Sequence, residues 1–334
     1  MEIDFALHQM TALRYFMPLI IEANKRGIKS NFFVGSCGKY NSPHLYKDLL
    51  FEISKRCGVK LWNLEFGKKR KNFMFFVGKN GLKELDIKAD NRTQKVVILT
   101  YMTDFTRNHE EGHNHLDMNK VDHMIYPSRY MAEYYGKNSD KNLYLGSPKY
   151  DIELDKEHIC KKYNLKKSDK KVLVIFPRNR DVNKIDLNQI YRGMRKMGYK
   201  VLVKTRGKDP VEDRFKGDYY FTDNSWYPHT TMELIEVSDL VVNFSSTSIK
   251  ECVMLKTPIV NFNIKPFELL LDFLYNYSYC EQVKIDFTFE DLQTAVKNLT
   301  ENNHNLAFDY VIDNYLFKKE NTSARILDYL ELKQ

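Results

Sequence analysis

Several features are missing from this sequence, and each absence excludes a class of protein. No apolar run approaches the roughly 20 residues that cross a bilayer. The first ten residues, "MEIDFALHQM", lack the basic start and long apolar region of a secretory signal. Short repeats and low-complexity tracts are also absent, and 14 glycines and 9 prolines are too few for a fibrous chain. We therefore expect a globular protein located in the cytoplasm.

Cysteine is scarce and scattered. The chain has five cysteines, an odd number, and no C-x-x-C pair. This pattern predicts neither a disulfide framework nor a zinc site. Cys252 is expected to pack inside a helix, and no metal is predicted.

The composition indicates ordinary folded domains with a positive charge. Apolar residues make up 43% of the 334 residues, which is enough for about two domains with separate cores. The net charge of +8 favours an anionic partner, which could be nucleic acid, an acidic membrane surface or a phosphorylated small molecule. Basic residues cluster at 67–73 and 161–171, and we interpret both clusters mainly as solvated loops. Phe73, Phe75 and Phe76 have two interpretations. They belong to a buried strand, or they contact a membrane surface together with Lys68–Lys71.

Short apolar runs alternate with segments of helical period along the whole chain. Continuous apolar strands that alternate with helices predict a parallel sheet covered on both faces. The plan occurs twice, and Gly146 and Pro148 interrupt it. The predicted fold class is therefore α/β, with two Rossmann-like doubly wound domains in tandem and a cleft between them. The predicted domains are residues 1–148 and 149–315. A terminal helix follows at 316–334, and one arrangement is that it packs back on the first domain.

Polar side chains follow four consecutive predicted strands of the second half. In open α/β sheets ligands bind at the carboxyl ends of the strands. The residues at these ends are cations, an aromatic loop and hydroxyls: Arg178, Arg180, Lys204, Arg206, the loop "NSWYPHT" and "SSTS". One arginine can bind two phosphate oxygens at once, and lysine acts as a point charge. These residues together therefore predict a site for a nucleoside diphosphate.

The segment "NFSSTSIKEC", residues 243–252, has two interpretations. One is a capping box, in which the Ser248 side chain caps a helix and Glu251 reaches back to the Ser248 amide. The other is an anion site built from small hydroxyls and free backbone N–H groups. Ser245 and Ser246 precede the cap and are harder to explain by helix chemistry.

A family resemblance covers roughly residues 120–330. "SDLVVNFSSTSIKECVMLKTPIVNF" resembles the nucleotide-binding segment of two-domain GT-B glycosyltransferases, in the style of CDP-glycerol glycerophosphotransferases and UDP-N-acetylglucosamine 2-epimerases. "YLGSPKYD" and "NTSARILDYL" resemble the end of the first domain and the closing helix of those proteins. The resemblance implies an acceptor-binding first domain and a donor-binding second domain. By the same resemblance, Ser245, Ser246 and Thr247 bind diphosphate, Glu251 binds ribose, and Trp226, Tyr227 and His229 lie near the base.

Two residues at predicted strand ends of the first half are candidates for a catalytic base. His8 follows the first strand and Asp104 follows a later one. A buried structural histidine and a helix cap are the respective alternatives. Between residues 105 and 120, His109, His113 and His115 suggest an acceptor-binding or lid loop, with metal ligation or a plain solvated loop as alternatives.

The resulting expectation is a transferase of cell-surface glycan biosynthesis. It would move a sugar or glycerol phosphate from a CDP- or UDP-linked donor to a glycan or lipid-linked acceptor, without a required cofactor. Location is expected in the cytoplasm, with peripheral membrane contact as a variant. An enzyme similar to a UDP-sugar 2-epimerase and a nucleic-acid-binding protein are the alternatives, although no recognisable nucleic-acid-binding module is present.

Overall fold

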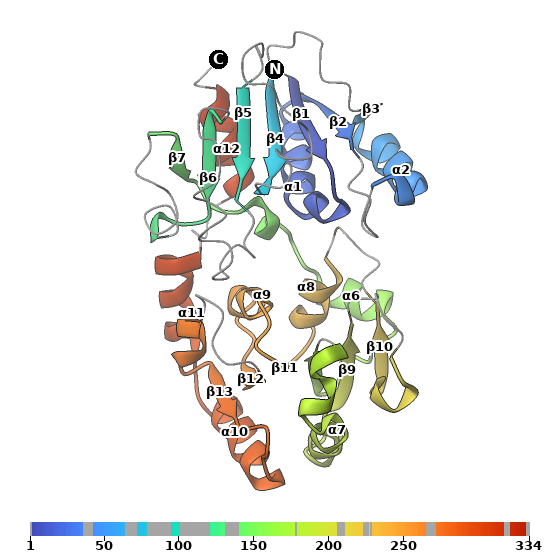
Figure 1. Cartoon of the computed structure of the whole chain (residues 1–334), viewed down its shortest axis with the longest axis vertical. Helices are drawn as coiled ribbons and strands as arrows, with labels where there is room; N and C mark the ends of the chain where they lie inside the picture. Colours follow the sequence, from blue (N-terminus) through green and yellow to red (C-terminus); the bar gives the residue numbers. More distant parts are fainter. Residues whose placement is uncertain are drawn as a thin grey trace. The chain divides into compact units, whose positions relative to one another are not determined.

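The computed structural model divides into two compact units. It describes residues 2–35, 43–63, 72–78, 95–100, 121–130, 140–177, 179–205, 211–222, 227, 229–264, 272–316 and 321–331. Unit 1 contains Met1–Ile152 together with Asp313–Gln334, and unit 2 contains Glu153–Ile312. Each unit is built around one parallel sheet, so the predicted α/β class with two doubly wound domains is confirmed (Figure 1).

Unit 1 has a seven-stranded sheet in the order β3-β2-β1-β4-β5-β6-β7. Its strands are β1 (Glu2–Leu7), β2 (Lys29–Val34), β3 (Lys60–Asn63), β4 (Phe73–Val77), β5 (Lys95–Leu99), β6 (His123–Tyr126) and β7 (Asn142–Tyr144). Its helices are η1 (Met10–Ala12), α1 (Leu13–Lys25), η2 (Pro43–Tyr46), α2 (Lys47–Cys57), η5 (Pro148–Tyr150) and α12 (Thr322–Glu331). The strand order reverses between β1 and β4, so the carboxyl ends of these two strands mark the place where such sheets bind ligands.

The central strands of unit 1 are buried on both faces. All five residues of β4, "FMFFV", are buried, as the sequence predicts for a central strand. Phe73, Phe75 and Phe76 are at most 3% exposed, so the idea that they contact a membrane is wrong. The Phe5 ring of β1 stacks on Phe75 with ring centroids 5.4 Å apart, and it makes a tilted contact with Phe16 at 5.0 Å.

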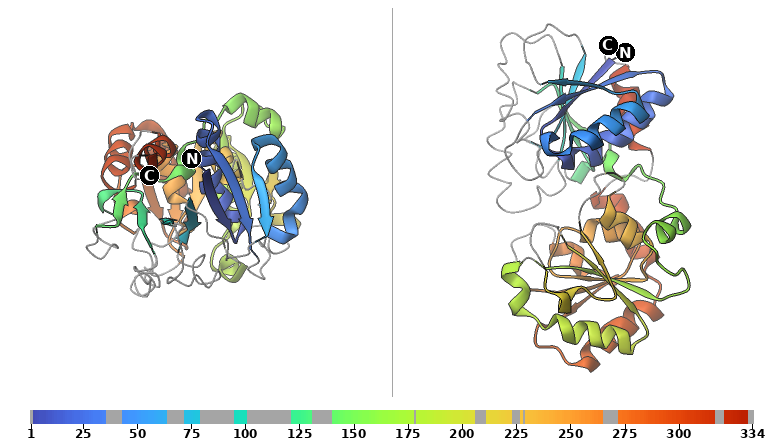
Figure 2. Two further views of the ribbon diagram at one scale, coloured as in Figure 1. Left: turned by 90° about the horizontal axis from the view of Figure 1, so that it is seen from above. Right: turned by 90° about the vertical axis from the view of Figure 1, so that its right-hand side faces the viewer.

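The end of the chain returns to unit 1 through α12, which packs on α1 (Figure 2). The Asp151 carboxylate accepts hydrogen bonds from the backbone N–H groups of Thr322 (3.0 Å) and Ser323 at the start of α12. Gly146 has φ +106°, and a Cβ atom there would lie 2.3 Å from Thr322 Oγ1. The segments "YLGSPKYD" and "NTSARILDYL" therefore contact each other directly, and their glycine and aspartate are explained by this contact.

Unit 2 has a six-stranded sheet in the order β10-β9-β8-β11-β12-β13. Its strands are β8 (Lys171–Ile175), β9 (Lys200–Lys204), β10 (Tyr219–Phe221), β11 (Leu240–Asn243), β12 (Ile259–Phe262) and β13 (Cys280–Val283). Its helices are α6 (Lys156–Lys162), η6 (Asn179–Lys184), α7 (Leu187–Lys196), η7 (Asp213–Phe215), α8 (Thr230–Glu236), α9 (Ile249–Met254), η8 (Asp272–Asn276), α10 (Phe289–Glu301) and α11 (Asn305–Val311), and η9 (Ile312–Leu316) follows at the border with unit 1.

Helices cover both faces of the second sheet. On one face, α7 and α10 pack together and share a core with the valines of β8 and β9. Helix α9 packs with α8 and α11. Cys252 of α9 is fully buried, as predicted, and burial raises the pKa of its thiol, which makes the group unreactive. The strand order of unit 2 reverses between β8 and β11, so the predicted diphosphate segment follows a strand at the reversal point.

Candidate functional site

The loop that leaves β11 has an unusual backbone. Ser245 adopts φ +48°, the left-handed region that glycine enters without strain but other residues enter at a cost of about 1–2 kcal/mol. Residues from Ser245 to Ser248 are partly exposed, so the loop is accessible. Strain of this kind persists where the surrounding structure fixes it, and it gathers at functional sites.

Side chains of β11, β12 and η8 fix this loop. The Oδ1 atom of Asn261 in β12 accepts from the Ser245 backbone N–H (3.0 Å) and from Asn243 Nδ2 (3.1 Å). The Tyr275 hydroxyl donates to the Ser246 carbonyl (3.1 Å). Asn243 and Asn261 are at most 1% exposed and lie opposite each other in the register of β11 and β12. Buried polar groups of this kind are retained when they are paired, and here they hold one backbone conformation in place.

The fixed loop presents hydrogen-bond donors. Within the described part of the chain, the backbone N–H groups of Ser246 and Thr247 donate to no protein acceptor. The Ser245 hydroxyl contacts Asn263 Oδ1 (3.3 Å), and the Ser246 hydroxyl contacts Ser248 Oγ (3.3 Å). Backbone N–H groups and small hydroxyls at the carboxyl edge of a parallel sheet can bind phosphate oxygens.

The capping-box interpretation of Ser248 and Glu251 is wrong. Ser248 has helical backbone angles (φ −65°, ψ −9°), and its side chain makes no capping hydrogen bond. Its backbone N–H donates to Ser246 Oγ at 3.4 Å instead of to Glu251. A true capping box occurs at the start of α10, where Thr288 has an extended backbone and exchanges hydrogen bonds with Asp291. Ser248 thus lacks the extended backbone that a capping residue usually has.

Lys204 lies at the carboxyl end of β9, the strand beside β8. It is 4% exposed, and its ammonium group donates to the carbonyl of Thr205. Strands β9 and β11 flank β8, so Lys204 and the Ser245 loop follow strands about 10 Å apart along the same edge. The sheet thus places these two predicted residues at one edge of unit 2.

The other described residues that are predicted to bind the nucleotide donor lie at the two helices beside this edge. His229 precedes α8 and is 8% exposed, and Tyr227 is half-buried two residues earlier. Glu251 is 6% exposed in the first turn of α9, which packs against α8. Helix α8 is anchored by Glu233, whose buried carboxylate accepts from Lys162 Nζ (2.7 Å) and the Tyr163 hydroxyl (2.5 Å).

Several predicted site residues lie outside the described residues, and their roles stay predictions. These are Asp104, His109, His113, His115, Arg178, Arg206 and Trp226. Arg180 lies in η6, and the role of its side chain also stays a prediction. The basic residues Lys68–Lys71 fall outside the described ranges as well.

His8 follows β1 at the reversal point of unit 1. The imidazole is 4% exposed, and its Nδ1 atom lies 3.4 Å from the Ala6 carbonyl. Burial lowers the pKa of His8 from its ordinary value of 6.5, and the contact with Ala6 offsets only part of this effect. The imidazole is therefore neutral at pH 7 and can accept a proton.

Asn243 and Asn261 are site residues that sequence reasoning missed. The signal was present, because "LVVNF" and "PIVNF" carry asparagine at the same place in two apolar strands. Asparagine is depleted in strands, so a matching pair in two central strands indicates a polar contact between them.

The described residues contain neither a metal-ligand cluster nor a membrane-spanning helix. No cluster of three or more histidine, cysteine, aspartate or glutamate side chains has the arrangement of a metal site in the described ranges. Across the same ranges, no helix is long and apolar enough to cross a membrane.

Comparison with known proteins decides the fold. No family model and no curated protein matches the sequence. Among solved structures, wall teichoic acid polymerase TagF has a TM-score of 0.66 at 13% identity, with 99% of this chain and 88% of that chain covered. The chain has a GT-B fold.

Two other solved structures with this fold cover almost all of both chains. The UDP-GlcNAc 2-epimerase from Methanocaldococcus jannaschii has a TM-score of 0.64 at 12% identity, with 99% of this chain and 100% of that chain covered. The glycotransferase of kitacinnamycin has a TM-score of 0.65 at 11% identity, with 99% and 98% covered. The GT-B resemblance stated from the sequence is thus confirmed at the level of the fold.

Proposed function

We propose that this GT-B protein is a transferase that takes a sugar or polyol phosphate from a nucleotide-activated donor and gives it to a glycan or lipid-linked acceptor. Unit 2 would bind the donor and unit 1 the acceptor. The observation that carries this proposal is the loop Ser245–Ser248, which follows a strand at the reversal point of the sheet in a strained and fixed conformation. TagF, one of the proteins with this fold, has been studied after soaking with CDPG.

The loop has the chemistry that a diphosphate needs. The N–H groups of Ser246 and Thr247 would donate to phosphate oxygens, and the hydroxyls of Ser245 and Thr247 would add to them. Lys204 would supply positive charge from the same edge of the sheet, with Arg178, Arg180 and Arg206 as further predicted cations. Because Asn261 and Tyr275 already hold the loop, donor binding would require little reorganisation.

Negative charge accumulates on the departing nucleotide during transfer. Fixed N–H groups and cations stabilise that charge without rearranging, which is the largest contribution in many enzymes. His8 in unit 1 would accept the proton of the acceptor hydroxyl, because its lowered pKa keeps it unprotonated at neutral pH. Asp104 remains the second candidate for this role.

A thermal-shift screen against CDP, UDP, GDP, ADP and CMP tests the donor site. A ligand that binds the folded state at 100 times its Kd stabilises it by about 2.7 kcal/mol. We expect one nucleoside diphosphate to raise the melting temperature clearly more than the others, and CMP to raise it less than CDP. No shift with any diphosphate would contradict the proposal.

The variant Ser246→Asp locates the site. It places a negative charge where the diphosphate would bind, so the nucleotide-induced shift should disappear while the unliganded protein stays folded. Ser168→Asp is the matched control, because Ser168 is exposed in a turn of the same unit. A shift that survives Ser246→Asp would place the nucleotide elsewhere.

A 2-epimerase-like activity is the second candidate, favoured by the M. jannaschii structure with the same fold. An epimerase needs no second substrate, whereas a transferase releases free nucleotide only when an acceptor is present. Chromatography of the donor with and without acceptor separates the two. Binding of nucleic acid instead would show an affinity that falls steeply with salt and no saturation by one nucleotide.

A further inference from the structure

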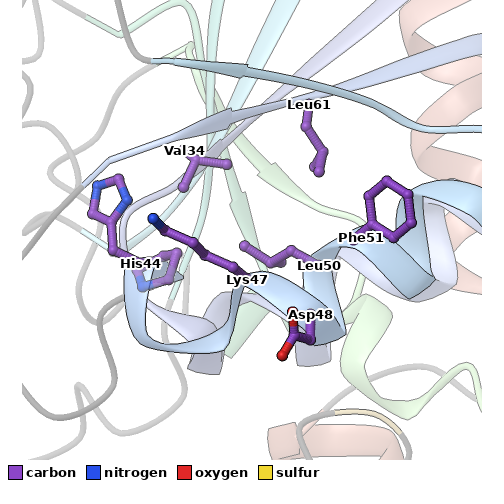
Figure 3. A pocket seen from close by; sticks show the side chains of 8 residues that line it. Val34, His44, Lys47, Asp48, Leu50, Phe51 and Leu61 are labelled. Atoms are coloured by element: carbon purple, nitrogen blue, oxygen red, sulfur yellow. The ribbon is translucent and has the colours of Figure 1, made fainter.

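Unit 1 has an open pocket of about 650 Å³ between α2, η2 and the ends of β2 and β3. Its size falls within the range of small-molecule sites, roughly 300–1,000 Å³. Figure 3 shows that the side chains around it differ in character from one end to the other. The pocket lies outside the residues assigned above to the donor site or to proton transfer.

One end of the pocket is apolar and accessible. Leu50 forms its buried wall, while Phe51 is 66% exposed and Leu61 is 37% exposed. Leu61 belongs to β3, the edge strand of the sheet. Exposed apolar side chains that gather around a hollow mark binding sites, whereas exposed apolar side chains that stand alone are common on protein surfaces and need no explanation.

The other end of the pocket is cationic. Lys47 and His44 lie close to Val34, and their nitrogen atoms are directed to the same side (Figure 3). Asp48 points the other way from the helix, so its carboxylate lies apart from these two groups. Neither Lys47 nor His44 has an ion-pair partner in the part of the chain that the structure describes. This end of the pocket is therefore suited to an anion.

The strand register shows how the two ends of the pocket are placed along the sheet. Val34 is the last residue of β2 and pairs with Leu7, the residue before His8. Leu61 pairs with Phe32, two positions farther from the carboxyl edge. The cationic end thus lies at the edge of the sheet that carries His8, and the apolar end extends away from it.

We propose that this pocket binds an anionic amphiphile, a single apolar chain with a phosphate head. The phosphate contacts Lys47 and His44, and the chain lies along Leu50, Phe51 and Leu61. A free phosphate would leave the apolar wall exposed, and an uncharged chain would leave the Lys47 ammonium and the His44 ring nitrogens without a partner. An amphiphile satisfies both ends at once.

The inference concerns unit 1 alone and stands without the nucleotide site. Its reading as the acceptor site, in which the amphiphile is the lipid-linked acceptor, rests on the proposed function. The two can fail separately because the donor site and the pocket lie in different units and are measured with different ligands.

Isothermal titration with n-octyl phosphate, below its critical micelle concentration, tests the proposal. We expect saturable binding of one molecule per chain, at least about tenfold tighter than n-octanol or inorganic phosphate. Octanol binding as tightly as octyl phosphate would overturn the role of Lys47 and His44. Protein that binds only vesicles with anionic lipid, and not the monomeric amphiphile, would overturn the pocket in favour of a surface attraction.

Paired variants locate the ligand. Phe51→Ser and Lys47→Glu should each raise the Kd for octyl phosphate about tenfold. Leu306→Ser, at an 88% exposed site in unit 2, and Lys55→Glu, farther along α2, should leave it unchanged. Both test residues are exposed, and melting curves verify that each variant is folded. Equal losses in test and control variants would overturn the proposal, and the nucleotide-induced thermal shift should be the same in all four.

Discussion

His8 and Ser245 have comparable places in the two sheets, since each follows a strand that flanks the reversal of strand order. Their surroundings differ. His8 is buried, and burial lowers the pKa of its imidazole. Ser245 lies above two paired asparagines and a tyrosine hydroxyl, which hold its backbone in a left-handed conformation. The same fold thus supplies a neutral imidazole in unit 1 and a set of fixed backbone N–H groups in unit 2.

Under the proposed function, this difference is how one architecture would divide two tasks. The carboxyl edge of a parallel sheet gathers loops regardless of their sequence, so the fold provides the location. The chemistry comes from a few side chains at the ends of the strands. In unit 1 that chemistry depends on desolvation, and in unit 2 it depends on hydrogen bonds to the backbone.

The largest expected effect comes from replacing the imidazole of unit 1. A positioned general base contributes about 10²–10⁴-fold to a rate, so His8→Gln should lower turnover of the donor by that factor. The nucleotide-induced thermal shift should stay unchanged, because the donor loop lies in the other unit. His158→Gln is the control, since His158 is exposed in α6. Normal turnover in His8→Gln would transfer the role of base to Asp104.

The lowered pKa of His8 also sets a pH dependence. Activity should remain level as the pH falls to about 6.5 and decrease only at lower pH, where the folded imidazole takes up a proton. Stability should fall over the same acid range, because the unfolded chain binds the proton first. In His8→Gln this share of the acid destabilisation should disappear, which urea titrations at several pH values would measure.

The fold was predictable from the sequence because its signals are local. Runs such as "KVLVIF" and "LVVNF" indicate strands that are buried on both faces, and Gly146 and Pro148 indicate the interruption between the two halves of the chain. The contact of Gly146 with Thr322 could not be predicted in the same way. It joins residues far apart in the chain, and no period or turn rule encodes such a pairing.

The candidate site was predictable only in part. The hydroxyl run was recognised, but its conformation was not, because Ser248 and Glu251 have the spacing of a capping box and do not form one. The deciding interaction comes from Asn261, sixteen residues after Ser245, across two strands whose register the sequence does not state. Local sequence rules predicted a hydrogen bond between Ser248 and Glu251, but the structure has the tertiary hydrogen bond from Ser245 to Asn261 instead.

The next largest effect should come from the support of the unit 2 loop. Asn261→Ala leaves the Ser245 N–H and the Asn243 amide without their shared acceptor. Loss of a buried hydrogen-bond partner costs about 1–3 kcal/mol per group, so we expect a loss of about 2 kcal/mol in the free energy of unfolding. The nucleotide Kd should rise about tenfold as the loop loses its fixed conformation. Chemical denaturation and nucleotide titration measure the two effects.

A matched variant distinguishes support of the loop from general damage. Asn263→Ala removes only the 3.3 Å contact with the Ser245 hydroxyl and leaves the backbone hydrogen bonds in place. It should cost less than about 1 kcal/mol and change the nucleotide Kd little. If both variants weaken nucleotide binding equally, the backbone conformation is not what the asparagine pair controls.

The smallest expected effect tests whether Ser245 contributes its backbone or its hydroxyl. Glycine adopts φ +48° without strain, which offsets the lost contact with Asn263 and the greater freedom of the unfolded chain. Ser245→Gly should therefore change the free energy of unfolding by no more than about 0.5 kcal/mol, whereas Ser245→Val, with a branched side chain in the left-handed region, should cost about 2 kcal/mol. If Ser245→Gly also keeps the nucleotide-induced shift, the N–H groups of the loop are the recognition element. If the shift is lost in a protein of unchanged stability, the Ser245 hydroxyl itself contacts the ligand, and unit 2 would depend on side chains as unit 1 does.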